Sequence, residues 1–253
     1  MKTVDLNSDL GESFGAYTIG CDEKVIPLIS SANVACGYHA GDALVMKKTV
    51  ALCRENGVAV GAHPGYPDLS GFGRRNMNVT PDEMYAYIVY QVGALRAFVE
   101  SAGLTLNHVK PHGAMYNMAG KDAKLADAVA RAVRDSAPGA YLLALAGSEM
   151  IRAAEELGIP CASEVFADRA YEDDGSLVAR SKPGAVITDE DEALSRTVRM
   201  VKDGLVTTIT GNDIHLRADS ICVHGDNAHA LEFVTRIRKA LAEEGIEAAP
   251  YRS

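Results

Sequence analysis

The chain has 253 residues, of which 47% are hydrophobic and 23% are charged, and its formal net charge is −9 at pH 7. This length and apolar content suit a single (β/α)-barrel domain over residues 1–253. The negative charge would repel the phosphate backbone, which argues against nucleic-acid binding. Residues 1–5 begin no apolar signal segment, and no run approaches the roughly 18 to 20 apolar residues that cross a bilayer. We therefore expect a cytoplasmic protein that does not enter membranes. The five cysteines form no C-x-x-C pair, so we expect reduced thiols.

Short β-branched or small-residue runs alternate along the chain with longer segments of 3.6-residue periodicity. This alternation predicts repeated βα units around a parallel sheet. The seven predicted strands lie at residues 3–9, 30–36, 58–63, 107–112, 140–146, 161–168 and 220–226.

Capping residues mark the ends of the predicted helices. Asp42 is expected to cap a helix that stops at Gly57. Thr80 to Glu83 form a capping box with Pro at the first helical position, and that helix should reach about Gly103. Further N-caps are predicted at Asp122, Ser148, Thr188 and Asp226, and further helix ends at Gly158, Gly204 and Gly245.

Two segments interrupt the βα rhythm. Residues 65–75 contain too much Gly and Pro for a helix and predict a long loop after the third strand. Residues 171–187 predict an excursion around Asp173-Asp174-Gly175. Because long loops in compact domains are often functional, each is a candidate lid or substrate wall, and we expect loop 65–75 to lie over the active-site cavity.

Polar side chains are predicted to gather inside the barrel, because residues two apart along a strand share a face. In the first strand Asp5, Asn7 and Asp9 share the interior face, and Glu12 follows in the next loop. The same rule places His63, His108, Lys110, His112, Glu164, Asp168, Cys222, His224 and Asp226 on interior faces. Active sites of barrel enzymes lie at the C-terminal end of the strands. We therefore expect six of these residues to converge on one cavity there: Asp5, Asn7, His63, Lys110, Glu164 and His224.

Clustered His, Asp and Glu residues suit a divalent metal, a general acid/base pair or the binding of a small polar substrate, and their spacing does not rank these. Barrel interiors also hold hydrogen-bonded polar side chains, so His108 is readily explained as structural and Asp226 as a helix cap. Burying the whole set without a function would cost too much free energy. The sequence contains neither a phosphate-binding loop motif nor a G-x-S-x-G nucleophile elbow.

Several sequence blocks, from residue 5 to residue 226, together resemble one known family. They are DLNSDLGESFG at 5–15, SANVACGYHAGD at 31–42, GAHPGYPD at 61–68 with GFGRR at 71–75, HVKPHGAMYN at 108–117, EVFADR at 164–169 and CVHGD at 222–226. These blocks resemble the LamB/YcsF family in content and order. The resemblance implies an irregular seven-stranded (β/α) barrel similar to the glycoside hydrolase/deacetylase superfamily. It also implies ATP-coupled hydrolysis of 5-oxoproline to L-glutamate by a complex with B and C subunits.

A five-membered lactam is an unactivated amide, so its opening requires stabilisation of an oxyanion and protonation of a poor nitrogen leaving group. Phosphorylation of the lactam oxygen would relieve both demands. Since the chain lacks a phosphate-binding loop, we expect ATP to act as a co-substrate whose chemistry depends on the partner subunits.

Within this resemblance the candidate catalytic residues are Asp9, Glu12, His63, Lys110 and His112. The candidate substrate-binding residues are Asp5, Asn7, Asn33, His39, Arg74, Arg75, Glu164, Asp168, Arg169, His224 and Asp226, among which the arginines would clamp a carboxylate. Asp9, His39 and His63 are the candidates for holding a divalent metal ion.

Two other functions remain open from the sequence. One is a self-sufficient metal-dependent deacetylase or amidohydrolase on the same barrel, which would hydrolyse an amide without ATP. The other is a non-catalytic subunit that only delivers the substrate to its partners.

Overall fold

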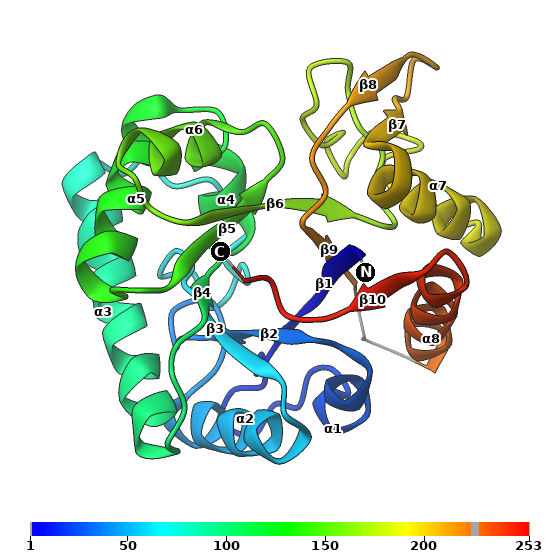
Figure 1. The fold of residues 1–253 in the computed structure, drawn as a ribbon. Helices are drawn as coiled ribbons and strands as arrows, with labels where there is room; N and C mark the ends of the chain where they lie inside the picture. Colours follow the sequence, from blue (N-terminus) through cyan, green and yellow to red (C-terminus); the bar gives the residue numbers. More distant parts are fainter. Residues whose placement is uncertain (1, 224–227, 253) are drawn as a thin grey trace.

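The computed structural model describes residues 2–223 and 228–252, and its centre is a closed barrel of seven parallel strands (Figure 1). In order around the barrel the strands are β1 (Lys2–Leu10), β2 (Ser31–Ala35), β3 (Ala59–His63), β4 (His108–Val109), β5 (Tyr141–Leu145), β6 (Cys161–Phe166) and β9 (Ser220–Cys222). The ring closes because β9 pairs with both β6 and β1. This architecture confirms the predicted seven-stranded barrel.

A short strand outside the ring brings the two ends of the described chain together. Strand β10 (Ile246–Ala248) pairs in parallel with the start of β1, where Lys2 lies opposite Ile246. Figure 1 accordingly shows the N-terminus close to β10, at the N-terminal end of the barrel.

Strand β4 is the main irregularity of the barrel, since only two of the six residues predicted for it form a regular strand. The cause is Pro111, which has no N–H to donate to a sheet. The backbone nevertheless continues beside β3, because the Lys110 amide donates to the Ala62 carbonyl at 2.9 Å and the His112 amide donates to the Pro64 carbonyl at 2.8 Å.

Helices surround the barrel, as Figure 1 shows. They are α1 (Asp22–Val25), the 3₁₀ turn η1 (Ile26–Leu28), α2 (Ala43–Asn56), α3 (Pro81–Ser101), α4 (Gly113–Ala119), α5 (Ala123–Ser136), α6 (Glu149–Glu156), α7 (Glu190–Asp203) and α8 (Ala228–Glu243).

Most predicted helix ends agree with the structure. Asp42 caps α2 by accepting from two backbone amides, and Thr80 and Glu83 form the predicted capping box. The N-cap predicted at Thr188 is wrong by one residue: the Asp189 carboxylate caps α7 by accepting from the Glu192 amide, which satisfies an otherwise unpaired donor of the first turn. The cap predicted at Asp226 lies outside the described residues.

The apolar core fills the space between the barrel and its helices, and it includes residues from Val4 to Ile246. Polar side chains occupy the inside of the barrel instead. His108 is one of them, and it needs Gly61 on the neighbouring strand, because a Cβ atom at Gly61 would lie 2.1 Å from the His108 Nε2. The five cysteines are free thiols, as expected.

An antiparallel hairpin that the sequence did not predict supports the excursion after β6. It consists of β7 (Leu205–Thr207) and β8 (Asp213–His215). The Asp173 carboxylate in the excursion accepts hydrogen bonds from the Thr208 and Thr210 hydroxyls beside this hairpin. These bonds fix the position of a long segment that contains little regular structure of its own.

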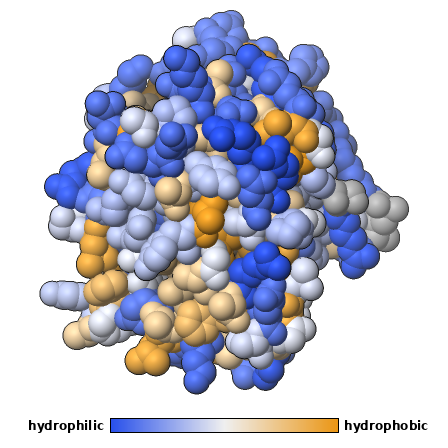
Figure 2. All heavy atoms as spheres, turned by 90° about the vertical axis from the view of Figure 1, so that its left-hand side faces the viewer, coloured by the Kyte–Doolittle hydropathy of each residue, from blue (hydrophilic) through white to orange (hydrophobic). Residues whose placement is uncertain are grey.

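Figure 2 views the molecule from the side on which α3 and α5 lie in Figure 1. Hydrophilic residues dominate the upper part of this face, whereas mildly to strongly hydrophobic residues gather in its lower part. Among the helices in the described part of the chain, none combines the length and the apolar composition that crossing a bilayer requires.

Candidate functional site

A cavity of about 450 Å³ opens at the C-terminal end of the barrel strands. Its lining includes charged and polar residues from several different strands or the segments that follow them: Asp9, His63, Arg74, Lys110, His112, Tyr116, Asn117, Arg169 and Arg180. Apolar contacts come from Phe166, Leu177 and Val178. In barrel enzymes this end of the strands carries the active site, so this cavity is the candidate site.

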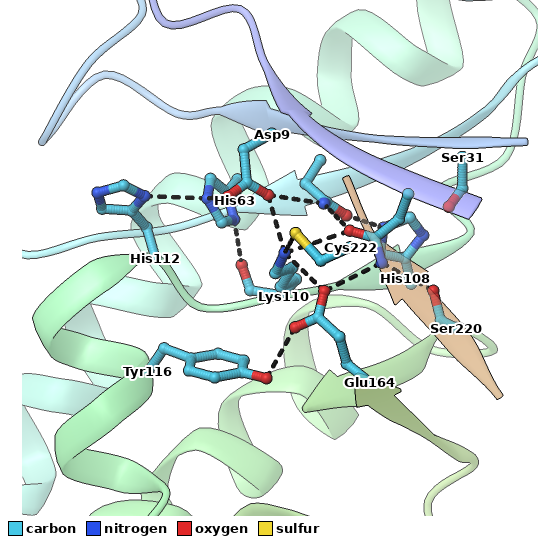
Figure 3. Close-up of polar contacts among 12 residues, drawn as sticks. Asp9, Ser31, His63, His108, Lys110, His112, Tyr116, Glu164, Ser220 and Cys222 are labelled. Carbon is cyan, nitrogen blue, oxygen red and sulfur yellow. Dashed lines mark hydrogen bonds and ion pairs between the residues drawn. The ribbon is translucent and has the colours of Figure 1, made fainter. Parts of the chain in front are cut away.

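The buried Lys110 ammonium is the centre of the polar network inside the site (Figure 3). It lies 2.9 Å from the Asp9 carboxylate and 2.7 Å from the Glu164 carboxylate. Burial by itself disfavours the ammonium, but Asp9, Cys222 and Glu164 outweigh it and raise the pKa of Lys110 well above its usual value. Lys110 is therefore a fixed positive charge rather than a proton donor.

Asp9 connects the lysine to a histidine at the cavity wall. Its Oδ1 accepts from Lys110 and from the Asn33 amide at 2.8 Å, while its Oδ2 lies 3.3 Å from the His63 Nε2. Burial opposes the carboxylate, but His63 and Lys110 outweigh it and hold the pKa of Asp9 well below its usual range. Asp9 is thus an ionised carboxylate at the edge of the cavity.

The orientations of His63 and His112 are fixed by backbone carbonyls. The His63 Nδ1 donates to the Lys110 carbonyl at 2.7 Å, and the His112 Nε2 donates to the Phe72 carbonyl at 2.8 Å, since a carbonyl oxygen can only accept. The remaining nitrogens, His63 Nε2 and His112 Nδ1, lie 3.0 Å apart (Figure 3). Burial lowers the pKa of His112 to about 3, so this ring is neutral at pH 7.

His39 and Glu12 complete a compact group with these two histidines. The His39 ring stacks on His112 with 3.7 Å between ring centroids, and its Nε2 lies 3.6 Å from the Glu12 Oε1. Burial, followed by the neighbouring His112 and His63, lowers the pKa of His39 well below its usual value. The ligand atoms of Glu12, His39, His63 and His112 all lie within 4.8 Å of one another, which makes this group able to hold a metal ion.

Loop 65–75 lies on the C-terminal face of the barrel, on the side where a lid was predicted. The Phe72 carbonyl is bound by His112, and the Ala114 amide donates to the Gly73 carbonyl at 2.9 Å. Gly73 has a φ of +60°, and a Cβ atom there would lie 2.7 Å from the His39 Cβ. The loop therefore packs directly on the histidines and forms a wall of the site.

Asp5 does not lie at this cavity, which corrects the predicted convergence. Its buried carboxylate accepts from the hydroxyls of Ser30, Ser31 and Ser220, and burial raises its pKa. Asp5 precedes Asp9 by four residues, and a strand rises about 3.3 Å per residue, so the two carboxylates lie about 13 Å apart along β1. Asp5 borders a separate hollow at the N-terminal end of the barrel.

The predicted amides occupy the layer between Asp5 and Asp9. The Asn7 side chain donates to Glu164 at 3.0 Å and to Ser220 at 2.8 Å, and its Oδ1 accepts from Asn33 at 2.7 Å. The Asn33 Oδ1 accepts from the His108 Nε2 at 2.6 Å. These residues hold Asp9 and Glu164 in place.

The structure separates the arginines that were predicted to bind a carboxylate. Arg74 lines the cavity. Arg75 forms an ion pair with Asp68 within loop 65–75. Arg169 also borders the cavity, but its guanidinium donates to the carbonyls of Val178 and Ala185 and so anchors the excursion after β6.

Sequence reasoning missed three polar residues at the site, Tyr116, Asn117 and Arg180. Tyr116 donates its hydroxyl to the Glu164 Oε2 at 2.7 Å (Figure 3), and Arg180 reaches the cavity from the excursion. Tyr116 stands within the block at 108–117, which was the signal that could have identified it. Asp168, which was predicted to bind the substrate, lies where the excursion begins, and its backbone carbonyl accepts from the amide of Ile187 at the end of the excursion, at 2.9 Å.

Two predicted substrate-binding residues, His224 and Asp226, lie outside the described residues.

The chain resembles known proteins over nearly its full length. The model of the LamB/YcsF family matches residues 4–253. The 5-oxoprolinase A subunit of Clostridium beijerinckii is 60% identical over 250 residues, which cover 99% of this chain and 98% of that one. The 5-oxoprolinase A subunit of Bacillus subtilis is 55% identical over 247 residues, 98% of this chain and 96% of the relative.

Two solved structures have similar folds. The lactam utilization protein from Thermus thermophilus has a TM-score of 0.93 and 46% identity, with 99% of this chain and 100% of that chain covered. The structure of T48 deacetylase with substrate has a TM-score of 0.51 and 13% identity, with 98% and 87% covered, and shows a likeness of fold alone. The family match and the identities over nearly the whole chain establish that the chain belongs to the LamB/YcsF family.

Proposed function

We propose that this chain is the A subunit of an ATP-dependent 5-oxoprolinase, and that it binds 5-oxo-L-proline and opens its lactam to give L-glutamate. Its relatives are named as the A subunit of 5-oxoprolinase and as a lactam utilization protein, and these names support this substrate. The word subunit in those names supports partner chains, which we take to be the B and C subunits. ATP is the co-substrate.

The observation that carries the proposal is the charge arrangement around the cavity. Asp9 and His63 face it as an ionised carboxylate and an imidazole 3.3 Å apart, beside the buried Lys110 ammonium. Arg74 and Arg180 border the same space. The substrate has a matching polarity, because its carboxylate suits the arginines while its lactam requires proton transfer and stabilisation of negative charge.

ATP relieves the poor reactivity of the lactam. Attack of the lactam oxygen on the γ-phosphorus forms an O–P bond and releases ADP. A first water adds to the activated carbon, the ring C–N bond breaks and the nitrogen takes up a proton, which leaves an acyl phosphate. A second water adds to this acyl phosphate and breaks its C–O bond to phosphate, which gives the carboxylate and inorganic phosphate. The products are glutamate, ADP and inorganic phosphate. In this scheme the ionised Asp9 accepts and returns the protons, His63 lies against it at 3.3 Å, and Lys110 keeps Asp9 ionised.

A reconstitution experiment tests the proposal. The purified chain alone is expected to produce no glutamate at a useful rate, with or without ATP, whereas addition of the B and C partners should give glutamate and ADP in equal amounts. ATP-independent amide hydrolysis by the chain alone would instead identify a self-sufficient amidohydrolase. If the chain binds 5-oxoproline but the complex keeps its full rate after replacement of His63, the chain is a delivery subunit.

Arg180 is expected to bind the substrate carboxylate. Replacing a residue that donates a charge-assisted hydrogen bond costs about 1.5–3 kcal/mol, so Arg180→Leu should raise the KM for 5-oxoproline about tenfold or more. The value of kcat should change much less. The matched control is Arg134→Leu, since Arg134 is exposed on α5 and paired with Asp135. An unchanged KM in the Arg180 variant would remove this residue from the substrate site.

A further inference from the structure

We propose that Glu12, His63 and His112 bind a divalent transition-metal ion of the zinc class at the wall of the cavity. The binding of the ion does not depend on the proposed function, whereas its part in lactam opening rests on that function.

The first observation is the tautomer state of the two histidines. His63 Nδ1 and His112 Nε2 each donate to a backbone carbonyl, of Lys110 and of Phe72. The opposite nitrogens, His63 Nε2 and His112 Nδ1, are the ones left to carry a lone pair or a proton; they lie only 3.0 Å apart, and the His63 Nε2 also lies 3.3 Å from the Asp9 Oδ2. Two lone pairs at this distance repel each other unless a proton or a cation lies near both.

The carbonyl contacts are themselves typical of metal ligands. A histidine that binds a metal usually donates its other ring N–H to a carboxylate or a backbone carbonyl, which fixes the ring and raises its basicity as a ligand. Both His63 and His112 have such a partner.

The third observation is the spacing of the donor atoms. Ligands bound at about 2.1 Å to a tetrahedral ion lie about 3.4 Å from one another. The observed separations are 3.0 Å between the two histidine nitrogens and 3.8 Å from His112 Nδ1 to the Glu12 Oε1. A shared proton would explain the first distance but would not require a carboxylate at the second, so a metal ion accounts for more of the arrangement.

His39 supports this site by packing. Its ring lies parallel to His112, with an angle of 1° between the planes and 3.7 Å between the centroids. Because the lone pair of an imidazole lies in the ring plane, two parallel stacked rings cannot both point at one ion at bonding distance. We assign the ligand to His112, whose second nitrogen has a carbonyl partner, and we assign His39 as a positioning residue.

Three protein ligands leave a fourth position of a tetrahedral zinc ion for water or a carbonyl oxygen, as in catalytic zinc sites. His63 and His112 both line the cavity in which we place the lactam. A bound ion would there supply Lewis-acid polarisation of a carbonyl or activation of water. Asp9, which was a metal candidate from the sequence, is paired with Lys110 and Asn33 through its Oδ1, and its Oδ2 lies 3.3 Å from the His63 Nε2, where its negative charge would favour a cation.

The test uses the isolated full chain after chelator treatment. Titration with Zn²⁺ by calorimetry, and metal analysis after dialysis, should give one ion per chain. Loss of a direct ligand should cost at least as much as loss of an outer partner, so His63→Gln and His112→Gln should each weaken Zn²⁺ binding about 100-fold or more. His215→Gln is the matched control, because His215 is exposed on β8, and it should bind like the wild type.

Circular dichroism would establish that the variants fold, and the visible absorption of bound Co²⁺ in the wild type gives a readout that does not need any variant. The inference is overturned if the wild type binds Zn²⁺ no more tightly than His63→Gln, or if its Co²⁺ spectrum is that of the free aqueous ion. Turnover by the chelated complex separates the two proposals. If the chain binds no metal but the complex opens 5-oxoproline, only the metal site is refuted. If the chain binds metal but the complex does not act on 5-oxoproline, only the proposed function is refuted.

Discussion

In the reconstituted complex, replacement of His63 by Ala or of Asp9 by Ala is expected to lower kcat by about 10²-fold or more, the usual scale for losing a positioned acid/base or electrostatic group. The two side chains should act as a unit, because the Asp9 Oδ2 lies 3.3 Å from the His63 Nε2 and both line the cavity. The double variant should therefore lose little more activity than either single variant.

Steady-state formation of ADP and glutamate measures this effect. His215→Ala serves as the control, since His215 is an exposed histidine on β8 that does not line the cavity. Binding of 5-oxoproline to the isolated variants should be measured in parallel, because the proposed role concerns the reaction rather than affinity. Wild-type kcat in both single variants would contradict the assigned roles and favour a subunit that only delivers substrate.

The barrel could be predicted because the sequence repeats its signals. Each βα unit combines a short apolar strand with a capped helix, and the alternation of side chains along the strands correctly placed Asn7, Lys110 and Glu164 on the interior face. A strand has a period of two residues, so the face on which a side chain lies follows from its position alone. This rule accounts for the part of the candidate site that lies on regular strands.

The same rule does not tell how far along the barrel axis a side chain lies. Asp5 and Asp9 share a face, yet Asp5 lies among serine hydroxyls near the other end of the barrel. The contacts that irregular segments make could not be predicted from the sequence either, because they depend on tertiary packing. Arg75 turned out to pair with Asp68, and Arg180 reaches the cavity only because the excursion folds back over the barrel. No periodic pattern in the sequence encodes these positions.

Loss of the Lys110 charge is expected to produce the largest effect on stability. Its ammonium group lies between the Asp9 and Glu164 carboxylates, and its side chain is only 3% exposed. Lys110→Met would preserve most of the volume but leave both carboxylates without their buried cation. Removing one partner of a buried ion pair typically costs about 3–5 kcal/mol in the free energy of unfolding. Urea denaturation of the isolated chain measures this loss.

A second substitution tests whether charge is the cause. Glu164→Gln removes one carboxylate and keeps an oxygen that can accept from the Tyr116 hydroxyl, which donates to Glu164 at 2.7 Å in the wild type. If unpaired charge destabilises Lys110→Met, adding Glu164→Gln should recover about 0.5–3 kcal/mol, the usual range of coupling between residues in contact. The recovery should be incomplete, because Asp9 would still lack its partner. If the two losses simply add, lost packing rather than unpaired charge would explain the instability, and the electrostatic role of Lys110 in holding Asp9 ionised would have to be abandoned.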